Sequence, residues 1–241
     1  IHDVAIQELP VRFMLDRSGL VGADGPTHQG VYDLTYLRMI PGMTLMVPRN
    51  GAELRRMIDF CYQHETGPIA LRYPRGNTCS TEETEVPPIE MGKAHLLQDG
   101  TDIVLLAVGV MVEAAFETAK KLEKEGYSVA VVNARFVKPL DRDLILKLAS
   151  FCKLVVTMEE NSIHGGFGSA VLELLNVSEN STPTLSFGIP DRFIAQGSPE
   201  EQRRDAGLSA EHMLNNIHER LKQIRIPVRK KSIKLTRKKA S

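Results

Sequence analysis

The segment from Asp16 to Gly30, DRSGLVGADGPTHQG, gathers the side chains best suited to chemistry. His28 is the one group in it that titrates near neutral pH, so it could exchange a proton with a substrate hydroxyl or carbonyl. Asp24 could orient an imidazole or a hydroxyl. Arg17 has the fork geometry that suits a phosphate or a carboxylate. We therefore take this segment as the leading site candidate.

The residues alone leave other interpretations of this segment open. The histidine could be an exposed or structurally satisfied side chain, and Arg17 could form an ordinary ion pair with Asp16 or Asp24. Glycines at positions 22, 25 and 30 would let the backbone adopt positive φ angles and approach a ligand closely.

A second cluster, RYPRGN, begins at Arg72. Arg75 lies beyond the end of an apolar run and is followed by a glycine, which suits anion recognition. Arg72 falls inside the run, which favours a structural role.

A third stretch, EENSIHGGFGSAV, covers residues 159–171. Its glycines could imitate a phosphate-cradling turn, but their spacing matches neither GxGxxG nor GxxxxGK[ST]. A tight turn from strand to helix, packed against a neighbour, is the favoured interpretation, and the role of His164 stays open. No spacing in the chain is typical of a metal site, so we expect no metal ligands in it.

The elements that must position these loops follow an alternating α/β pattern. Short apolar runs predict strands at 11–15, 44–47, 69–73, 102–108, 128–133, 153–158 and 184–187. Helical periodicity predicts helices at 52–64, 112–124, 141–151, 166–175 and 210–224. On the first of these helices we expect Leu54, Met57, Ile58 and Cys61 to form one buried face. Loops that follow parallel strands meet at one sheet edge, where such folds bind ligands.

The chain has 241 residues, of which 42% are hydrophobic and 25% charged, so collagen-like and disorder-dominated classes are excluded. Its length suits two modest domains. A stretch from residue 74 to 88, rich in turn formers and acidic residues, predicts a linker. We expect domains at 1–88 and 89–225, both in an α/β class with mainly parallel sheets.

Residues 226–241 form a basic tail that we expect to be disordered. Eight basic residues lie between positions 225 and 241, and the other 22 basic and 30 acidic residues give the rest of the chain a charge of −8. The tail could bind an anionic surface, but no aromatic side chain accompanies its charges, so nucleic acid is a disfavoured partner.

No apolar stretch is long enough to span a membrane. Three widely spaced cysteines suit a reducing compartment, and we expect a cytoplasmic protein.

The three stretches, together with NARFVKPLD at 133–141 and GIPDRFIAQGSPEEQ at 188–202, resemble the 1-deoxy-D-xylulose-5-phosphate synthases, a transketolase-like, thiamine-diphosphate-dependent family. The resemblance runs in register to about residue 224. It implies a partial thiamine-diphosphate pyrimidine-binding fold followed by a transketolase C-terminal domain. It also implies that pyruvate is condensed with D-glyceraldehyde 3-phosphate, with release of CO2, in isoprenoid, thiamine and pyridoxal precursor synthesis.

By motif position, the resemblance assigns Arg17 and Arg75 to the phosphate of the aldehyde, Asp24 to a substrate hydroxyl, and His28 to proton transfer. It implies thiamine diphosphate and Mg2+ as cofactors and a homodimer as the complete enzyme. The cofactor motifs of the family, a GDG-type metal motif, an activating glutamate and a stacking aromatic residue, are not found in this chain. We therefore expect a C-terminal portion that needs the N-terminal portion of the same enzyme and is inactive alone.

Two rival interpretations remain. One is a C-terminal subunit of a split transketolase or a 2-oxo acid dehydrogenase β-type chain, which shares both domains. The other is a non-catalytic module for dimerisation or binding. If strands of the first domain precede Ile1, that domain has a bare sheet edge, so we expect it to be less stable than residues 92–225.

Overall fold

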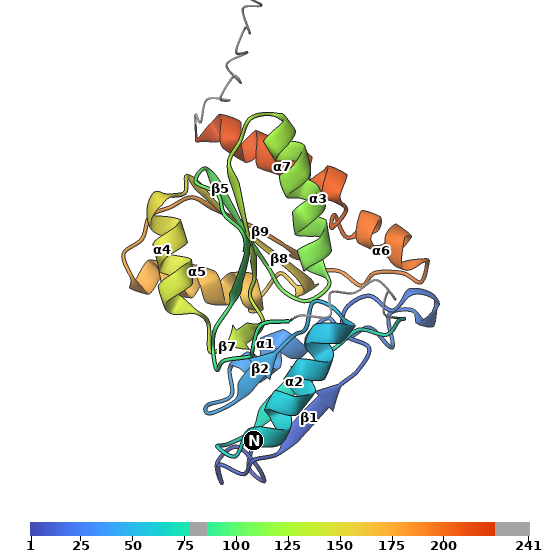
Figure 1. Cartoon of the computed structure of the whole chain (residues 1–241). Coiled ribbons are helices and arrows are strands. Elements are labelled where there is room, and N and C mark those ends of the chain that lie inside the picture. The colour runs from blue at the N-terminus through green and yellow to red at the C-terminus, as the bar shows by residue number, and fades with distance from the viewer. Residues whose placement is uncertain (78–85, 225–241) are drawn as a thin grey trace, which may run out of the picture.

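The computed structural model describes residues 1–77 and 86–224. The predicted basic tail and the centre of the predicted linker lie outside these ranges. The described chain folds around two β-sheets with helices between and around them (Figure 1). No helix of the described ranges combines the length and apolar character needed to cross a lipid bilayer.

The first sheet contains four strands in the order β1-β3-β2-β7. Their bounds are β1 Arg12–Leu15, β2 Thr44–Met46, β3 Ile69–Arg72 and β7 Phe136–Lys138. The first three are parallel, but β7 comes from the second half of the chain and runs antiparallel to β2. The sequence did not predict β7, which joins the two predicted domains through one sheet.

The second sheet contains five strands in the order β4-β6-β5-β8-β9. Their bounds are β4 His95–Gln98, β5 Ile103–Ala107, β6 Val129–Asn133, β8 Leu154–Ser162 and β9 Thr184–Ile189. Four of them are parallel, and the unpredicted strand β4 pairs antiparallel with β6. Both sheets are therefore mainly parallel, and each has one antiparallel edge strand.

Helices α3 and α7 cover one face of the second sheet and α4 and α5 the other, as Figure 1 shows. The α-helices of the described ranges are α1 Asp33–Arg38, α2 Gly51–Gln63, α3 Met111–Lys124, α4 Arg142–Phe151, α5 Phe167–Val177, α6 Pro199–Asp205 and α7 Ala210–Gln223. A short 3-10 helix, η1, spans Gly22–Asp24. The predicted helices are confirmed within a few residues, whereas α1, α6 and η1 are short elements that the periodicity did not indicate.

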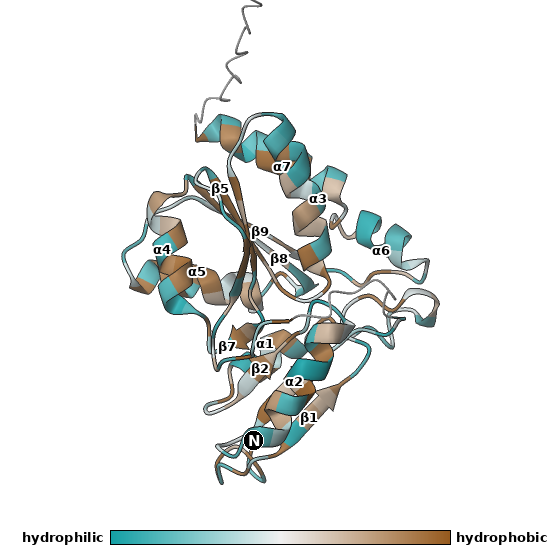
Figure 2. Cartoon of the chain, viewed as in Figure 1, coloured by the Kyte–Doolittle hydropathy of each residue, from teal (hydrophilic) through white to brown (hydrophobic). Residues whose placement is uncertain are grey.

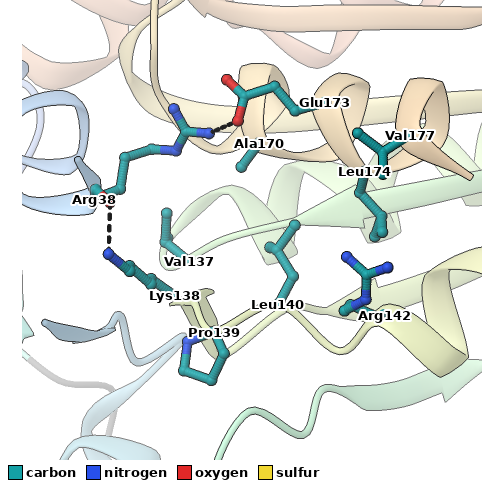
Figure 3. A pocket seen from close by; sticks show the side chains of 10 residues that line it. All are labelled: Arg38, Val137, Lys138, Pro139, Leu140, Arg142, Ala170, Glu173, Leu174 and Val177. Atoms are coloured by element: carbon teal, nitrogen blue, oxygen red, sulfur yellow. Dashed lines mark hydrogen bonds and ion pairs between the residues drawn. The ribbon is translucent and has the colours of Figure 1, made fainter. Parts of the chain in front are cut away.

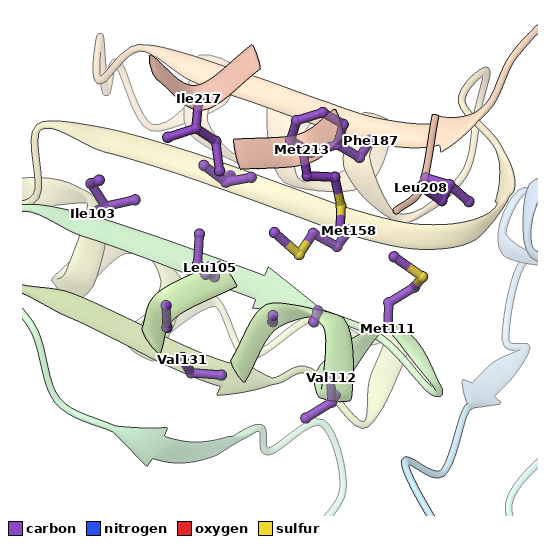
Figure 4. Close-up of a cluster of buried hydrophobic side chains, with 14 of the residues drawn as sticks. Ile103, Leu105, Met111, Val112, Val131, Met158, Phe187, Leu208, Met213 and Ile217 are labelled. Atoms are coloured by element: carbon purple, nitrogen blue, oxygen red, sulfur yellow. The ribbon is translucent and has the colours of Figure 1, made fainter. Parts of the chain in front are cut away.

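The side chains of β5 alternate between two hydrophobic clusters. Ile103 and Leu105 pack under α3 and α7 (Figure 4), while Val104 and Leu106 pack under α4 and α5. The brown strands at the centre of Figure 2 show this buried apolar layer. The second cluster also contains α1, β2 and β3 residues, so the two halves of the chain share one core.

A third, smaller cluster lies between α2 and the first sheet. Met57 and Cys61 are fully buried in it, and Leu54 packs against it, as the sequence predicted. Ile58 does not join this face, because its side chain stays 38% exposed. The helix therefore buries a narrower stripe than the predicted one.

Candidate functional site

The two candidate loops leave the first sheet side by side. Strands β1 and β3 are parallel neighbours with Leu15 opposite Arg72, so the segments that follow them start at the same sheet edge. The backbone N–H of Ser18 donates to the carbonyl of Tyr73 at 3.0 Å and ties the two loops together just past the strand ends. Residues some fifty positions apart in sequence thus share one surface.

Asp24 and Arg75 form an ion pair across these loops. The hydrogen bond from Arg75 lowers the pKa of Asp24, and the positive charges of Arg75, Arg17 and His28 contribute in the same direction, while burial opposes them. The other three predicted site residues therefore lie within electrostatic reach of the Asp24 carboxylate. Arg75 is the more exposed partner, with 56% of its side chain accessible against 26% for Asp24.

Arg17 lies beside this ion pair without joining it. It forms no salt bridge with any residue in the described ranges, so the open alternative of an Arg17 pair with Asp16 or Asp24 is not observed. Its φ angle of 57° falls in the left-handed region, which few non-glycine residues occupy. The hydrogen bond from the N–H of Gly30 to its carbonyl, at 3.1 Å, helps to fix this conformation.

His28 lies on the exposed outer part of the loop. Its Nδ1 is 3.0 Å from the hydroxyl of Thr27, which leaves Nε2 as the ring atom that a substrate can approach. The imidazole therefore has a hydrogen-bonded partner on one side and an accessible nitrogen on the other, an arrangement that suits proton exchange.

The glycines of this loop serve two different purposes. Gly22 and Gly25 have φ angles of 69° and 75°, as the sequence predicted. Gly30 is different, because its φ is not positive and a Cβ there would lie 2.6 Å from the carbonyl oxygen of Arg17. It permits a close approach of two backbone segments.

Arg72 has the structural role that the sequence favoured. Its Nε donates to both carboxylate oxygens of Asp33 at 2.8 and 2.9 Å, and both side chains are almost fully buried. Its Nη2 donates to the carbonyls of Gly30 and Glu160. A single buried guanidinium thus connects β3, the end of the candidate loop, α1 and strand β8 of the second sheet.

The third stretch, residues 159–171, is the predicted tight turn into α5, and it packs against α1. Thr35 donates its hydroxyl hydrogen to the carbonyl of His164 at 2.9 Å, and Arg38 donates to the carbonyl of Gly165 at 3.1 Å. The side chain of His164 is exposed. This stretch therefore holds the two halves of the chain together.

Two residues that contact the candidate loop were not predicted. Glu160 and Gln202 reach it from the second half of the chain, and Arg203 bonds to Glu160 behind it. The only sequence signal was that Glu160 and Gln202 lie in stretches that carry the family resemblance. Their polar types at buried positions become informative only once the burial is known.

Two cavities in the described ranges lie away from this loop. One, of about 320 Å³, is lined by Arg38, Lys138 and Arg142 over an apolar floor that includes Leu174 (Figure 3). The other, of about 590 Å³, lies beside α2. Neither is lined by a predicted site residue.

The described residues show no cluster of side chains suited to the metal ion of the cofactor. No group of three or more His, Cys, Asp or Glu within residues 1–77 and 86–224 is arranged to hold a metal ion. The two cysteines in these ranges, Cys61 and Cys152, are buried, and burial raises the pKa of each thiol to about 11.

Comparison with known proteins gives the family. Residues 1–81 match the transketolase pyrimidine-binding domain and residues 92–213 match the transketolase C-terminal domain. The 1-deoxy-D-xylulose-5-phosphate synthases of Thermosynechococcus vestitus and Trichodesmium erythraeum are 51% and 48% identical over 90% and 94% of the chain. The chain spans about a third of their length, 34% and 36%.

Solved structures agree with the sequence relatives. A split-gene transketolase, described as an inactive β4 tetramer, superposes with a TM-score of 0.81 at 30% identity and covers 91% of this chain and 69% of its own. The transketolase of Campylobacter jejuni superposes with a TM-score of 0.65 at 20% identity and supports the fold alone; the match covers 86% of this chain and 31% of that one. The chain belongs to the transketolase family of thiamine-diphosphate-dependent enzymes, with a pyrimidine-binding region followed by a C-terminal domain, and it resembles the 1-deoxy-D-xylulose-5-phosphate synthases in sequence.

Proposed function

We propose that this chain is the C-terminal portion of a 1-deoxy-D-xylulose-5-phosphate synthase and provides its binding site for the aldehyde acceptor. The complete enzyme would condense pyruvate with D-glyceraldehyde 3-phosphate and release CO2. The observation that carries the proposal is the convergence of Arg17, Asp24, His28 and Arg75 on two neighbouring strand-end loops. Identity near 50% to named synthases supports the same reaction class.

The charges of this surface suit a triose phosphate. Arg17 and Arg75 bring two positive charges, and the lowered pKa of Asp24 keeps its carboxylate ionised at neutral pH. The net positive charge attracts a phosphate dianion, and guanidinium groups bind its oxygens in pairs. The ion pair with Asp24 holds Arg75 at this surface. When phosphate binds, Arg75 would turn to it and free the carboxylate for a substrate hydroxyl.

His28 would act beside the bound phosphate. Its accessible Nε2 can donate a hydrogen bond to the carbonyl oxygen of the aldehyde or take part in its protonation as the new C–C bond forms. We assign the cofactor motifs and Mg2+ binding to the part of the enzyme that this chain does not span.

The same proposal divides the chain at residues 88 and 89, with a basic tail from 226 to 241 that is dispensable for chemistry. It places the enzyme in a bacterial cytoplasm or a plastid stroma, as a homodimer in its complete form. Sedimentation of the chain with and without the N-terminal portion of a relative measures the assembly. A complex that contains only one copy of each portion would contradict the proposed homodimer.

A complementation assay tests the proposed function. The chain is mixed with the N-terminal portion of the Thermosynechococcus vestitus synthase, thiamine diphosphate, Mg2+, pyruvate and D-glyceraldehyde 3-phosphate. We expect 1-deoxy-D-xylulose 5-phosphate and CO2 from the mixture and none from this chain alone. The His28→Asn variant should lower kcat, whereas a change at exposed His164, His164→Asn, serves as the control. Product from the isolated chain would refute the claim that it needs a complement.

The solved split-gene transketolase favours a second candidate, a subunit of a split transketolase. The same mixture supplied with pentose phosphates separates the two functions. Turnover of a ketose phosphate donor, with no decarboxylation of pyruvate, would favour the transketolase.

A further inference from the structure

The candidate acceptor loop is held from outside by two side chains of the second half of the chain, Glu160 and Gln202, and Arg203 holds Glu160 in turn. We propose that Glu160, Gln202 and Arg203, here called the clamp, are positioning residues that fix this loop for phosphate binding. The inference rests on the proposed function for its substrate, but its structural part stands on contacts that do not depend on that function.

Gln202 pairs with the loop backbone in both directions. Its Oε1 accepts from the N–H of Gly22 at 2.8 Å, and its Nε2 donates to the carbonyl of Gly22 at 3.1 Å and to that of Ala195 at 2.8 Å. The side chain is only 2% exposed. A buried amide that satisfies both polar groups of one loop residue restrains that residue strongly, because either group would otherwise be left unpaired.

Glu160 holds the loop two residues earlier. Its Oε2 accepts from the N–H of Leu20 at 3.2 Å, while its Oε1 accepts from Nε of Arg203 at 2.7 Å. The carboxylate is buried and fits against the bare Cα of Gly19, where an added Cβ would lie 2.0 Å from Oε2. The ion pair with Arg203 compensates the burial of the charge.

The loop conformation needs such support at Arg17, whose φ of 57° lies in a region that few non-glycine residues occupy, whereas Gly19, Gly22 and Gly25 adopt their positive φ angles of 69° to 75° readily. Sparsely populated backbone conformations persist where the surrounding structure over-determines them, and they are frequent at functional sites. The clamp supplies that restraint between Arg17 and Asp24, the two ends of the segment that would face the phosphate. The second half of the chain would thus set the geometry of a site whose reacting side chains all belong to the first half.

The experiment measures the loop and its ligand separately in the full chain. Hydrogen exchange at the amides of Leu20 and Gly22 reports the clamp, exchange in β5 reports the fold, and binding of glycerol 3-phosphate, an unreactive triose phosphate analogue, reports the site. We expect Gln202→Leu to speed exchange at Gly22 about tenfold and to weaken binding by at least a similar factor, with β5 unchanged. Glu200→Gln, an exposed change on the same helix, should alter none of these.

Conservative variants separate positioning from simple destabilisation. Gln202→Glu keeps the acceptor for Gly22, and Glu160→Gln keeps an acceptor for Leu20. The loop exchange rate and the analogue affinity of each should therefore lie between those of the parent and those of its disruptive counterpart, Gln202→Leu or Glu160→Ala. In the complemented enzyme, Gln202→Leu should raise KM for the aldehyde while kcat stays within about twofold. If Gln202→Leu disturbs β5, Gln202→Glu and Glu160→Gln carry the test.

The outcomes distinguish the two proposals. Unchanged loop exchange in the variants would overturn the clamp, as would faster exchange in a chain that binds the analogue as tightly as the parent. A parent chain that does not bind the analogue, with loop exchange still faster in the variants, would leave the clamp standing as a loop restraint and would count against the proposed function.

Discussion

The two sheets differ in where their strands and cores come from. Both have buried interior strands and an edge strand without a buried residue, β1 or β4, but all five strands of the second sheet belong to the second half of the chain, and helices of that half cover β5 and β6. The first sheet also takes its fourth strand and much of its core from the second half of the chain. The first half of the chain, which bears the candidate site, is therefore not an independent folding unit, because residues of the second half complete the core on one face of its sheet.

Core truncations should give the largest effects and show this dependence. Phe167→Ala removes a fully buried ring from the cluster that both halves share, and it should cost about 3–5 kcal/mol of unfolding free energy. Met57→Ala in the cluster under α2 should cost about 2–5 kcal/mol. Urea unfolding measures the totals. Hydrogen exchange should show both sheets losing protection in the first variant and only the first sheet in the second.

The parent protein supplies the baseline for that comparison. We expect β1 and β3 to exchange faster than β5 and β6. Equal protection in both sheets, or a Met57→Ala variant that exposes β5 as much as β3, would contradict the difference in stability.

A buried ion pair between the halves should give an effect of similar size. Glu53 on α2 is fully buried and accepts from Nε of Arg135 at 2.8 Å and from Asn133 at 2.9 Å. Glu53→Ala leaves the guanidinium buried without its counter-charge and should cost about 3–5 kcal/mol. Asp59→Ala, an exposed change on the same helix, is the control for thermal unfolding. A loss no larger than in this control would show that the pair does not join the halves.

The pH dependence of stability should reveal Glu159, a residue of β8 whose carboxyl group accepts hydrogen bonds from the first turn of α5. Burial raises the pKa of this carboxyl to about 7, although the N–H groups of Gly168 and Phe167 act to lower it. The native state therefore holds the proton more tightly than the unfolded state. Its contribution is complete below the unfolded pKa of 4.5 and is lost as the pH rises through 7, on the order of 3 kcal/mol in total.

Unfolding free energies measured at several pH values between 4 and 8 check this contribution, with Glu159→Gln as the comparison. The difference in unfolding free energy between parent and variant should change by about 3 kcal/mol as the pH rises from 4 to 8. A difference independent of pH would show that the carboxyl titrates normally.

The smallest expected effect concerns the site itself. Arg75→Ala removes a charge-assisted contact to phosphate and should weaken binding of glycerol 3-phosphate about 10- to 100-fold, equivalent to roughly 1.5–3 kcal/mol. Stability should hardly change, because the side chain is more than half exposed. Arg142→Ala, at the distant cavity, is the matched control. Calorimetric titration measures both, and equal affinities would remove Arg75 from the site.

The longer elements could be read from the sequence because each carries its own apolar pattern. Helix α3 and strands β5 and β6 were predicted within two residues. The short elements β7, α1 and α6 were missed because three to seven residues are too few for a period to show. Ile58 was placed wrongly because an apolar residue on a helix face is buried only where a neighbour covers it.

By itself, the sequence determined the alternating α/β order, the four side chains of the candidate site, and the resemblance that pointed to the family. These are properties of residue type and local spacing. Only the tertiary structure decided that Asp24 pairs with Arg75 rather than with Arg17, and that Gln202 reaches Gly22 from a position 180 residues away. The partner of a polar group depends on which distant segment buries it, and no local pattern encodes that.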